Sequence, residues 1–125
     1  MRDSPPLLRG PLLSRRRLKN RAEGRALWHY RLRGYRILGT NVWAGGHELD
    51  LVARRGGRLV FCEVKSKSGD GRGDPLEMVG SEKRRRLRVA AESFLAARPE
   101  LAELECSFEV VAVRGATLER VADAF

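Results

Sequence analysis

The stretch over residues 45–67 most constrains the fold, because its pattern is that of a β-hairpin. Residues 47–54 alternate apolar and polar side chains, and residues 59–64 are rich in β-branched and aromatic types. Gly56 and Gly57 lie between these segments and tolerate the positive φ angles of a two-residue turn. The stretch therefore predicts two antiparallel strands whose register is set by the turn.

This turn places Asp50 opposite Glu63 and Glu48 opposite Lys65, and strand alternation puts all four on one face. The other face is apolar and is expected to be a core surface; its residues are Leu49, Leu51, Ala53, Val60, Cys62 and Val64. Carboxylates directly opposite each other, with Cβ atoms about 5 Å apart, destabilise a sheet unless a cation lies between them. The register thus predicts a divalent metal ion between Asp50 and Glu63.

Two carboxylates and a lysine on one sheet face suit the hydrolysis of a phosphodiester bond. Hard oxygen ligands hold Mg²⁺ or Mn²⁺, and the metal acidifies a bound water and neutralises phosphate charge. The ammonium of Lys65 would orient that water or stabilise the transition state. Solvated charges on a surface hairpin give the same pattern, so the residues alone leave both interpretations open.

Asp50, followed after thirteen residues by Glu63-Val64-Lys65, resembles the PD-(D/E)xK nuclease signature in the spacing of archaeal Holliday-junction resolvases. Over residues 19–113 the chain more closely resembles the YraN family of small bacterial endonuclease-like proteins. The resemblance lies in the segments AEGRALWHYRLRGYRILGTN, GGHELDLVA, LVFCEVKSK, GDPLEMVGSEKRRRL and FEVVAV. His47 stands where the family often has glycine, and Glu109 where it usually has aspartate.

The resemblance implies an α/β fold of the restriction-endonuclease-like or resolvase-like type, with a mixed β-sheet flanked by helices. It implies metal ligation by Asp50, Glu63 and the main-chain carbonyl of Val64, with Glu23 beside the metal. The implied catalytic residues are Lys65, Glu63, Asp50 and Glu23. The implied activity is that of a metal-dependent endonuclease acting on DNA, including branched or structured DNA, and a homodimer is expected by analogy. A non-catalytic nucleic-acid-binding or adaptor protein with the same fold is the alternative.

A helix is predicted from residue 19 or 20 to residue 32, with Asn20 as N-cap and Gly34 as the C-terminal stop. Glu23 shares the helix face of Ala26, Leu27 and Tyr30, which should pack on the sheet. A salt bridge to an arginine or the helix dipole would also explain this carboxylate. Residues 1–18 are expected to form a flexible basic arm, and residues 19–125 the nuclease-like domain.

The remaining pattern predicts a strand over residues 35–40, a connection over residues 41–46 and a mobile loop over residues 68–75. Trp43 in the connection could cap the core or stack on a base, and packing on the core is favoured. A second helix is predicted over residues 81–98, capped by Ser81, followed by strands over residues 107–113 and 117–121. The loop aspartates Asp70 and Asp74 are interpreted as solvated, and Glu77 matters only through the resemblance. Cys62 and Cys106 are interpreted as buried, reduced thiols of a cytoplasmic protein.

The net charge of +9 favours a polyanionic partner, with nucleic acid ahead of an anionic membrane and DNA ahead of RNA. No apolar stretch reaches the length of a signal segment or a membrane span. Phosphate contacts are expected from basic residues in the arm, the loop and the second helix: Arg15, Arg16, Arg17, Lys67, Arg72, Lys83, Arg84, Arg85, Arg86 and Arg88.

Overall fold

The computed structural model describes residues 11–67 and 79–125 of the chain. In this part the elements follow the order α1 (Pro11–Leu32), β1 (Arg36–Ala44), β2 (His47–Arg55), β3 (Arg58–Lys67), α2 (Ser81–Ala96), the 3₁₀ helix η2 (Pro99–Leu101), β4 (Glu105–Arg114) and β5 (Thr117–Val121). The predicted α/β class and the predicted last strand are confirmed.

The described strands form one five-stranded sheet in the order β1-β2-β3-β4-β5. Neighbouring strands are antiparallel, except that β3 and β4 run parallel. A parallel pair needs a long crossover, and here the chain between β3 and β4 includes α2. The sheet is therefore mixed, as predicted, with β3 as its central strand.

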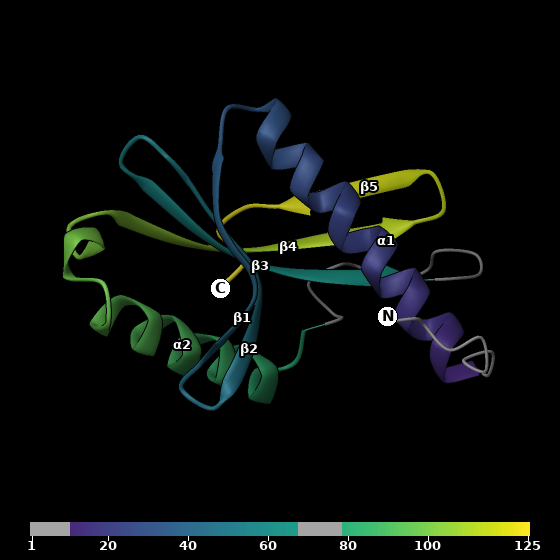
Figure 1. Cartoon of the computed structure of the whole chain (residues 1–125), viewed down its shortest axis with the longest axis horizontal. Helices are drawn as coiled ribbons and strands as arrows, with labels where there is room; N and C mark the ends of the chain where they lie inside the picture. The colour runs from purple at the N-terminus through teal and green to yellow at the C-terminus, as the bar shows by residue number, and fades with distance from the viewer. Residues whose placement is uncertain (1–10, 68–78) are drawn as a thin grey trace, which may run out of the picture.

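The two helices cover opposite faces of the sheet (Figure 1). On one face Ala26 and Tyr30 of α1 pack with β3 residues such as Val64. On the other face Phe94 of α2 packs with Phe61, whose ring it meets edge to face at 5.8 Å. The sequence pattern predicted one core face for the hairpin. The central strand is instead buried on both faces, because each face has its own helix.

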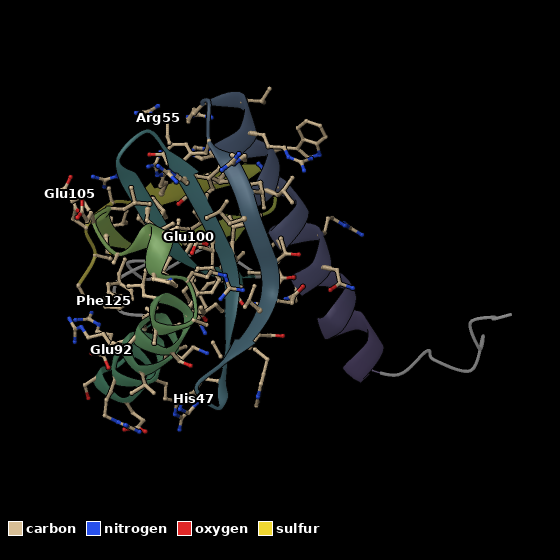
Figure 2. All side chains as sticks on the ribbon, turned by 60° about the vertical axis from the view of Figure 1, so that its left-hand side comes forward. His47, Arg55, Glu92, Glu100, Glu105 and Phe125 are labelled. Carbon is tan, nitrogen blue, oxygen red and sulfur yellow. The ribbon has the colours of Figure 1, made fainter. Side chains whose placement is uncertain are left out.

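The first two strands are joined by Gly45 and Gly46, whose φ angles are 59° and 81°. Both angles lie in the left-handed region that glycine adopts without strain, so the chain reverses in two residues. Residues 41–44 consequently belong to β1 and are not a connection, contrary to the prediction. Figure 2 shows His47 and Arg55 at opposite ends of the β2 ribbon that this turn starts. Trp43 lies beside the turn and is 72% exposed, so its predicted packing role was wrong.

Other differences concern element ends and one cysteine. Helix α1 begins at Pro11, so the predicted start at residue 19 or 20 was wrong, and residues 11–18 are helical where a flexible arm was expected. Residues 1–10 of that arm lie outside the described residues. The N-cap of α2 is Gly80 rather than Ser81, and this helix ends at Ala96. Cys62 is buried as predicted, whereas Cys106 is exposed.

Neither of the helices in the described part of the chain combines the length and the apolar composition that crossing a membrane requires.

Candidate active site

The predicted site lies where the pairing of β2 with β3 ends. Paired residues run from Arg55–Arg58 to Leu51–Cys62, which is the predicted register. The next residues on the two strands are Asp50 and Glu63. Here the main-chain N–H of Val64 donates to Oδ2 of the Asp50 side chain, at 2.9 Å. A carboxylate thus accepts a hydrogen bond from β3 at the end of the backbone ladder.

Strand β2 is irregular at the same point. Leu49 packs on the α2 side of the sheet and Leu51 on the α1 side, although alternation would place both on one face. The prediction that Leu49 shares a face with Leu51 was therefore wrong. In β1, Asn41 has a φ of 50° and lies between residues that pair with Leu51 and Leu49, so both strands depart from regular geometry beside Asp50.

Glu63 is a buried carboxylate, 2% exposed, between the sheet and α2. Its Oε2 lies 3.5 Å from the ammonium of Lys65 and 3.5 Å from that of Lys83. Its Oε1 is buried and has no hydrogen-bond partner among the described residues. Burial and then the charge of Asp50 raise the pKa of Glu63, and the nearby lysines oppose this rise. One oxygen of the predicted metal ligand thus has no partner in the part of the chain that the structure describes.

Lys19 contacts Asp50 from α1, which covers the face of the sheet opposite α2. Its ammonium donates to Oδ2 of Asp50 at 3.0 Å and to the main-chain carbonyl of Val64. Burial alone would lower the pKa of Lys19, but the charge and hydrogen bond of Asp50 raise it above its ordinary value. A cation therefore bridges two of the oxygens that the resemblance assigns to a metal.

Glu23, one helical turn after Lys19, reaches the edge of this group. Its Oε2 lies 3.8 Å from the Lys19 ammonium, and the side-chain amide of Asn41 lies 3.3 and 3.4 Å from its two oxygens. Burial and then the charge of Asp50 raise the pKa of Glu23, whereas Asn41 lowers it. The structure thus brings Glu23 beside Asp50, paired with Lys19 rather than with an arginine.

We call this group the acid–lysine cluster; its members are Glu23, Asp50, Glu63, Lys19, Lys65 and Lys83. Sequence reasoning missed Lys19 as a member and interpreted Lys83 as a phosphate-binding residue. The spacing of Lys19 four residues before Glu23 was the one available signal, since such residues are neighbours on a helix. The predicted register also paired Lys65 with Glu48. In the structure Lys65 contacts Glu63 of its own strand, because the β2–β3 ladder ends before it reaches Glu48 and Lys65.

The donor set fits a divalent metal ion. The side chains of Asp50 and Glu63 and the carbonyl of Val64 are hard oxygen donors of the kind that Mg²⁺ and Mn²⁺ prefer. Glu63 Oε1 has no hydrogen-bond partner within residues 11–67 and 79–125, and the contacts of Lys19 show that the other two groups accept a cation. Across residues 11–67 and 79–125, no three His, Cys, Asp or Glu side chains gather as a metal site. Water would therefore complete the coordination of an ion held here.

The basic residues of α2 are largely engaged with the protein itself. Arg85 and Arg86 pair with Glu82 at 2.8 and 3.3 Å, and these arginines hold the pKa of Glu82 at about 2. Arg84 donates to the carbonyl of Val79, and Arg88 lies over the Phe125 ring. Their predicted contacts with phosphate stay predictions. The other predicted residues lie outside the described side chains: Arg15, Arg16, Arg17, Lys67 and Arg72, together with Asp70, Asp74 and Glu77.

Glu109, on β4, is a further buried carboxylate, fully enclosed on the α1 side of the sheet. It accepts hydrogen bonds from Tyr30 Oη at 2.6 Å, Arg120 Nε at 2.7 Å and an Arg58 nitrogen at 3.1 Å. Burial alone would raise the pKa of Glu109, but these donors, Arg120 foremost, hold it below its ordinary value. Both oxygens are satisfied, so this acid has the partners of a structural residue, unlike Glu63.

Comparison with known proteins gives one consistent family. The chain matches the model of "Uncharacterised protein family UPF0102" over residues 22–113. A UPF0102 protein of Synechococcus sp. (strain JA-3-3Ab) is 47% identical over 81 residues. The match covers 64% of this chain and 62% of that protein, which is less than two thirds of the relative's length. A relative from Pseudomonas entomophila is 40% identical, over 75% of this chain and 76% of its own length. One from Desulforamulus reducens is 37% identical, over 81% and 84%.

Proposed function

This chain belongs to the uncharacterised protein family UPF0102, which includes the YraN proteins, and we propose that it hydrolyses DNA phosphodiester bonds with a divalent metal ion at the acid–lysine cluster. The observation that carries the proposal is the pair of buried carboxylates, Asp50 and Glu63, beside the Val64 carbonyl at the break in the β2–β3 ladder. Burying two acids side by side destabilises a fold, and active sites commonly contain such costly groups.

In this proposal Asp50, Glu63 and the Val64 carbonyl hold Mg²⁺ or Mn²⁺. When bound, the metal would lower the pKa of a water ligand and neutralise charge on the phosphate. Lys65, half-buried and held by Glu63, places an ammonium beside the reacting phosphate, where developing negative charge is stabilised. Glu23, fixed by Asn41, accepts a proton or orients water at the edge of the site.

The substrate class follows from charge. A net charge of +9 on 125 residues attracts a polyanion, and phosphate contacts of this kind depend little on sequence. DNA is proposed ahead of RNA, and branched DNA and a homodimer are proposed by analogy with junction resolvases.

A second function is favoured by one observation. Each carboxylate of the acid–lysine cluster already has an ammonium within 4 Å, so the described residues neutralise one another without a metal. A nucleic-acid-binding or adaptor protein with this fold would therefore need no metal ion at the acid–lysine cluster.

The experiment that separates the two functions is a cleavage assay with Mg²⁺, Mn²⁺ or EDTA over duplex, flap, junction and single-stranded DNA and over RNA. Lys65→Ala should remove about a hundredfold of the metal-dependent rate, since a positioned cation at a charged transition state is commonly worth about 3 kcal/mol. The variant should keep its DNA affinity and melting temperature, because Lys65 is partly exposed and Lys83 still lies 3.5 Å from Oε2 of Glu63.

Arg36→Ala is the matched control, since it removes one positive charge from an exposed position on β1. It should cut at the native rate. If the native protein cuts no substrate and Lys65→Ala instead lowers the melting temperature, the lysine is structural and the binding function replaces the nuclease.

A further inference from the structure

Lys19 occupies the position that a metal ion at this site would take. Its ammonium is bound to Oδ2 of Asp50 and to the carbonyl of Val64, two of the three groups proposed as metal ligands. It also lies 3.8 Å from Glu23 Oε2. An ammonium and a divalent cation seek the same oxygens, and two cations held by the same pair of oxygens repel each other strongly in a half-buried site.

We propose that Lys19 is an internal competitor of the metal: it neutralises Asp50 in the metal-free protein, and a divalent ion binds only by displacing it. This inference rests on the proposed function, because it concerns the same metal site. The competition sets a threshold concentration of free divalent ion below which the site stays closed by the lysine.

The surroundings of Lys19 suit such an exchange. Lys65 and Lys83 both contact Glu63 Oε2 and leave Asp50 and the Val64 carbonyl to Lys19. The side chain of Lys19 is 34% exposed, so it has a route to solvent. A lysine has a flexible four-carbon stem, and its ammonium can leave the site without moving the helix. Glu23, one turn further along α1, gives the released ammonium an adjacent partner.

Lys19 also has a structural role before metal binds. Val64 N–H and Lys19 Nζ both donate to Oδ2 of Asp50, at 2.9 and 3.0 Å, so they fix this carboxylate where β2 leaves the ladder. The competitor thus keeps a metal ligand in place while lowering the affinity for the metal.

The test is the affinity for Mn²⁺ alone, measured by titration calorimetry without nucleic acid. Lys19→Met should bind Mn²⁺ about tenfold tighter than the native protein, within the range usual for coupled binding events. Without metal the variant should melt at a lower temperature, since Asp50 loses its counterion, and saturating Mn²⁺ should remove that deficit.

Lys19→Gln guards against a variant that fails to fold. Glutamine is polar but carries no charge and is one bond shorter than lysine, so this variant too should bind Mn²⁺ more tightly. The matched control is Arg21→Met, an exposed position two residues along the same helix, where the affinity should stay within about twofold of native.

The possible outcomes distinguish a failure of the competition by Lys19 from a failure of the proposed metal-dependent function. If Asp50→Asn loses Mn²⁺ binding while both Lys19 variants bind as weakly as the native protein or more weakly, the competition is refuted and the metal site stands. If the native protein and all variants fail to bind Mn²⁺, the competition and the metal-dependent function are both overturned.

Discussion

Replacing Glu63 by glutamine should stabilise the metal-free protein while abolishing metal binding. Glutamine has the same shape and no charge. In the native protein the Glu63 side chain is 2% exposed, and burying an ionised carboxylate costs several kcal/mol, whereas burying a neutral amide costs about 1–3 kcal/mol. The two ion pairs that the variant loses offset only part of this cost, because both lysines are partly exposed and their attraction to Glu63 is screened by solvent. The net gain should be about 1 kcal/mol, or about 3–6 °C in melting temperature for a chain of this size.

The pH dependence gives the sign of this effect. The pKa of Glu63 is raised in the folded protein, by burial first and then by Asp50, so ionisation of Glu63 destabilises the fold. Its contribution to stability is present below the ordinary glutamate pKa of 4.5 and is lost as the pH rises through the folded-state value. The native protein and Glu63→Gln should therefore melt alike at the lowest pH and diverge as the pH rises, the variant being more stable.

Thermal melts followed by far-ultraviolet circular dichroism in EDTA, from pH 4 to pH 8, measure this difference. Glu48→Gln is the matched control: it removes the same charge from an exposed position on β2 and should change stability by less than about 0.5 kcal/mol. Adding Mn²⁺ should reverse the order, because only the native protein gains binding energy. If Glu63→Gln were less stable than the native protein at pH 8 in EDTA, the reasoning would be refuted. The attraction of Lys65 and Lys83 for Glu63 would then exceed the cost of burying its charge.

Two further predictions concern carboxylates outside the acid–lysine cluster. Glu109→Gln should lower the free energy of unfolding at pH 7 by about 3 kcal/mol in urea titrations, because it removes the charged partner of buried donors such as Tyr30 and Arg120. The depressed pKa of Glu109 means that the stabilisation by its ionised form is present above pH 4.5 and is lost as the pH falls through the folded-state pKa. If Glu109→Gln lowered the free energy of unfolding by the same amount at pH 3 as at pH 7, ionised Glu109 would not be the source of the stability. Glu82→Gln should free Arg85 and Arg86 from their ion pairs and so steepen the log–log salt dependence of duplex binding by about 1–2 units. The slope is measured by fluorescence anisotropy, and an unchanged slope would show that these two arginines do not contact DNA.

Much of the hairpin could be predicted, because its rules are local. A glycine pair fixes the turn, and strand alternation then fixes the register from Leu51–Cys62 to Arg55–Arg58. The same rules failed at Leu49, where β2 departs from regular alternation beside Asp50. No periodicity reports such a local break.

The lysines of the site depend on how distant elements pack. Lys19 and Lys83 come from helices on opposite faces of the sheet and reach carboxylates that lie far from them in sequence. Both lysines also stand in arginine-rich segments whose pattern is that of a solvated, phosphate-binding surface. The start of α1 was missed for a related reason: in residues 11–18 a run of three arginines separates the leucines, so no helical period is evident.

The placement of the aromatic residues has a practical consequence for optical measurements. The sequence contains two tryptophans, and Trp28 and Trp43 are 57% and 72% exposed in the folded protein. Their indole rings already face water, so their emission should change little when the chain unfolds. Trp43 pairs across from Glu48, which lies two residues along β2 from Asp50, so it is close to the proposed site of nucleic-acid cleavage. Stacking of a base on an indole quenches its emission, so the proposed binding of nucleic acid should change the intrinsic fluorescence more than unfolding does.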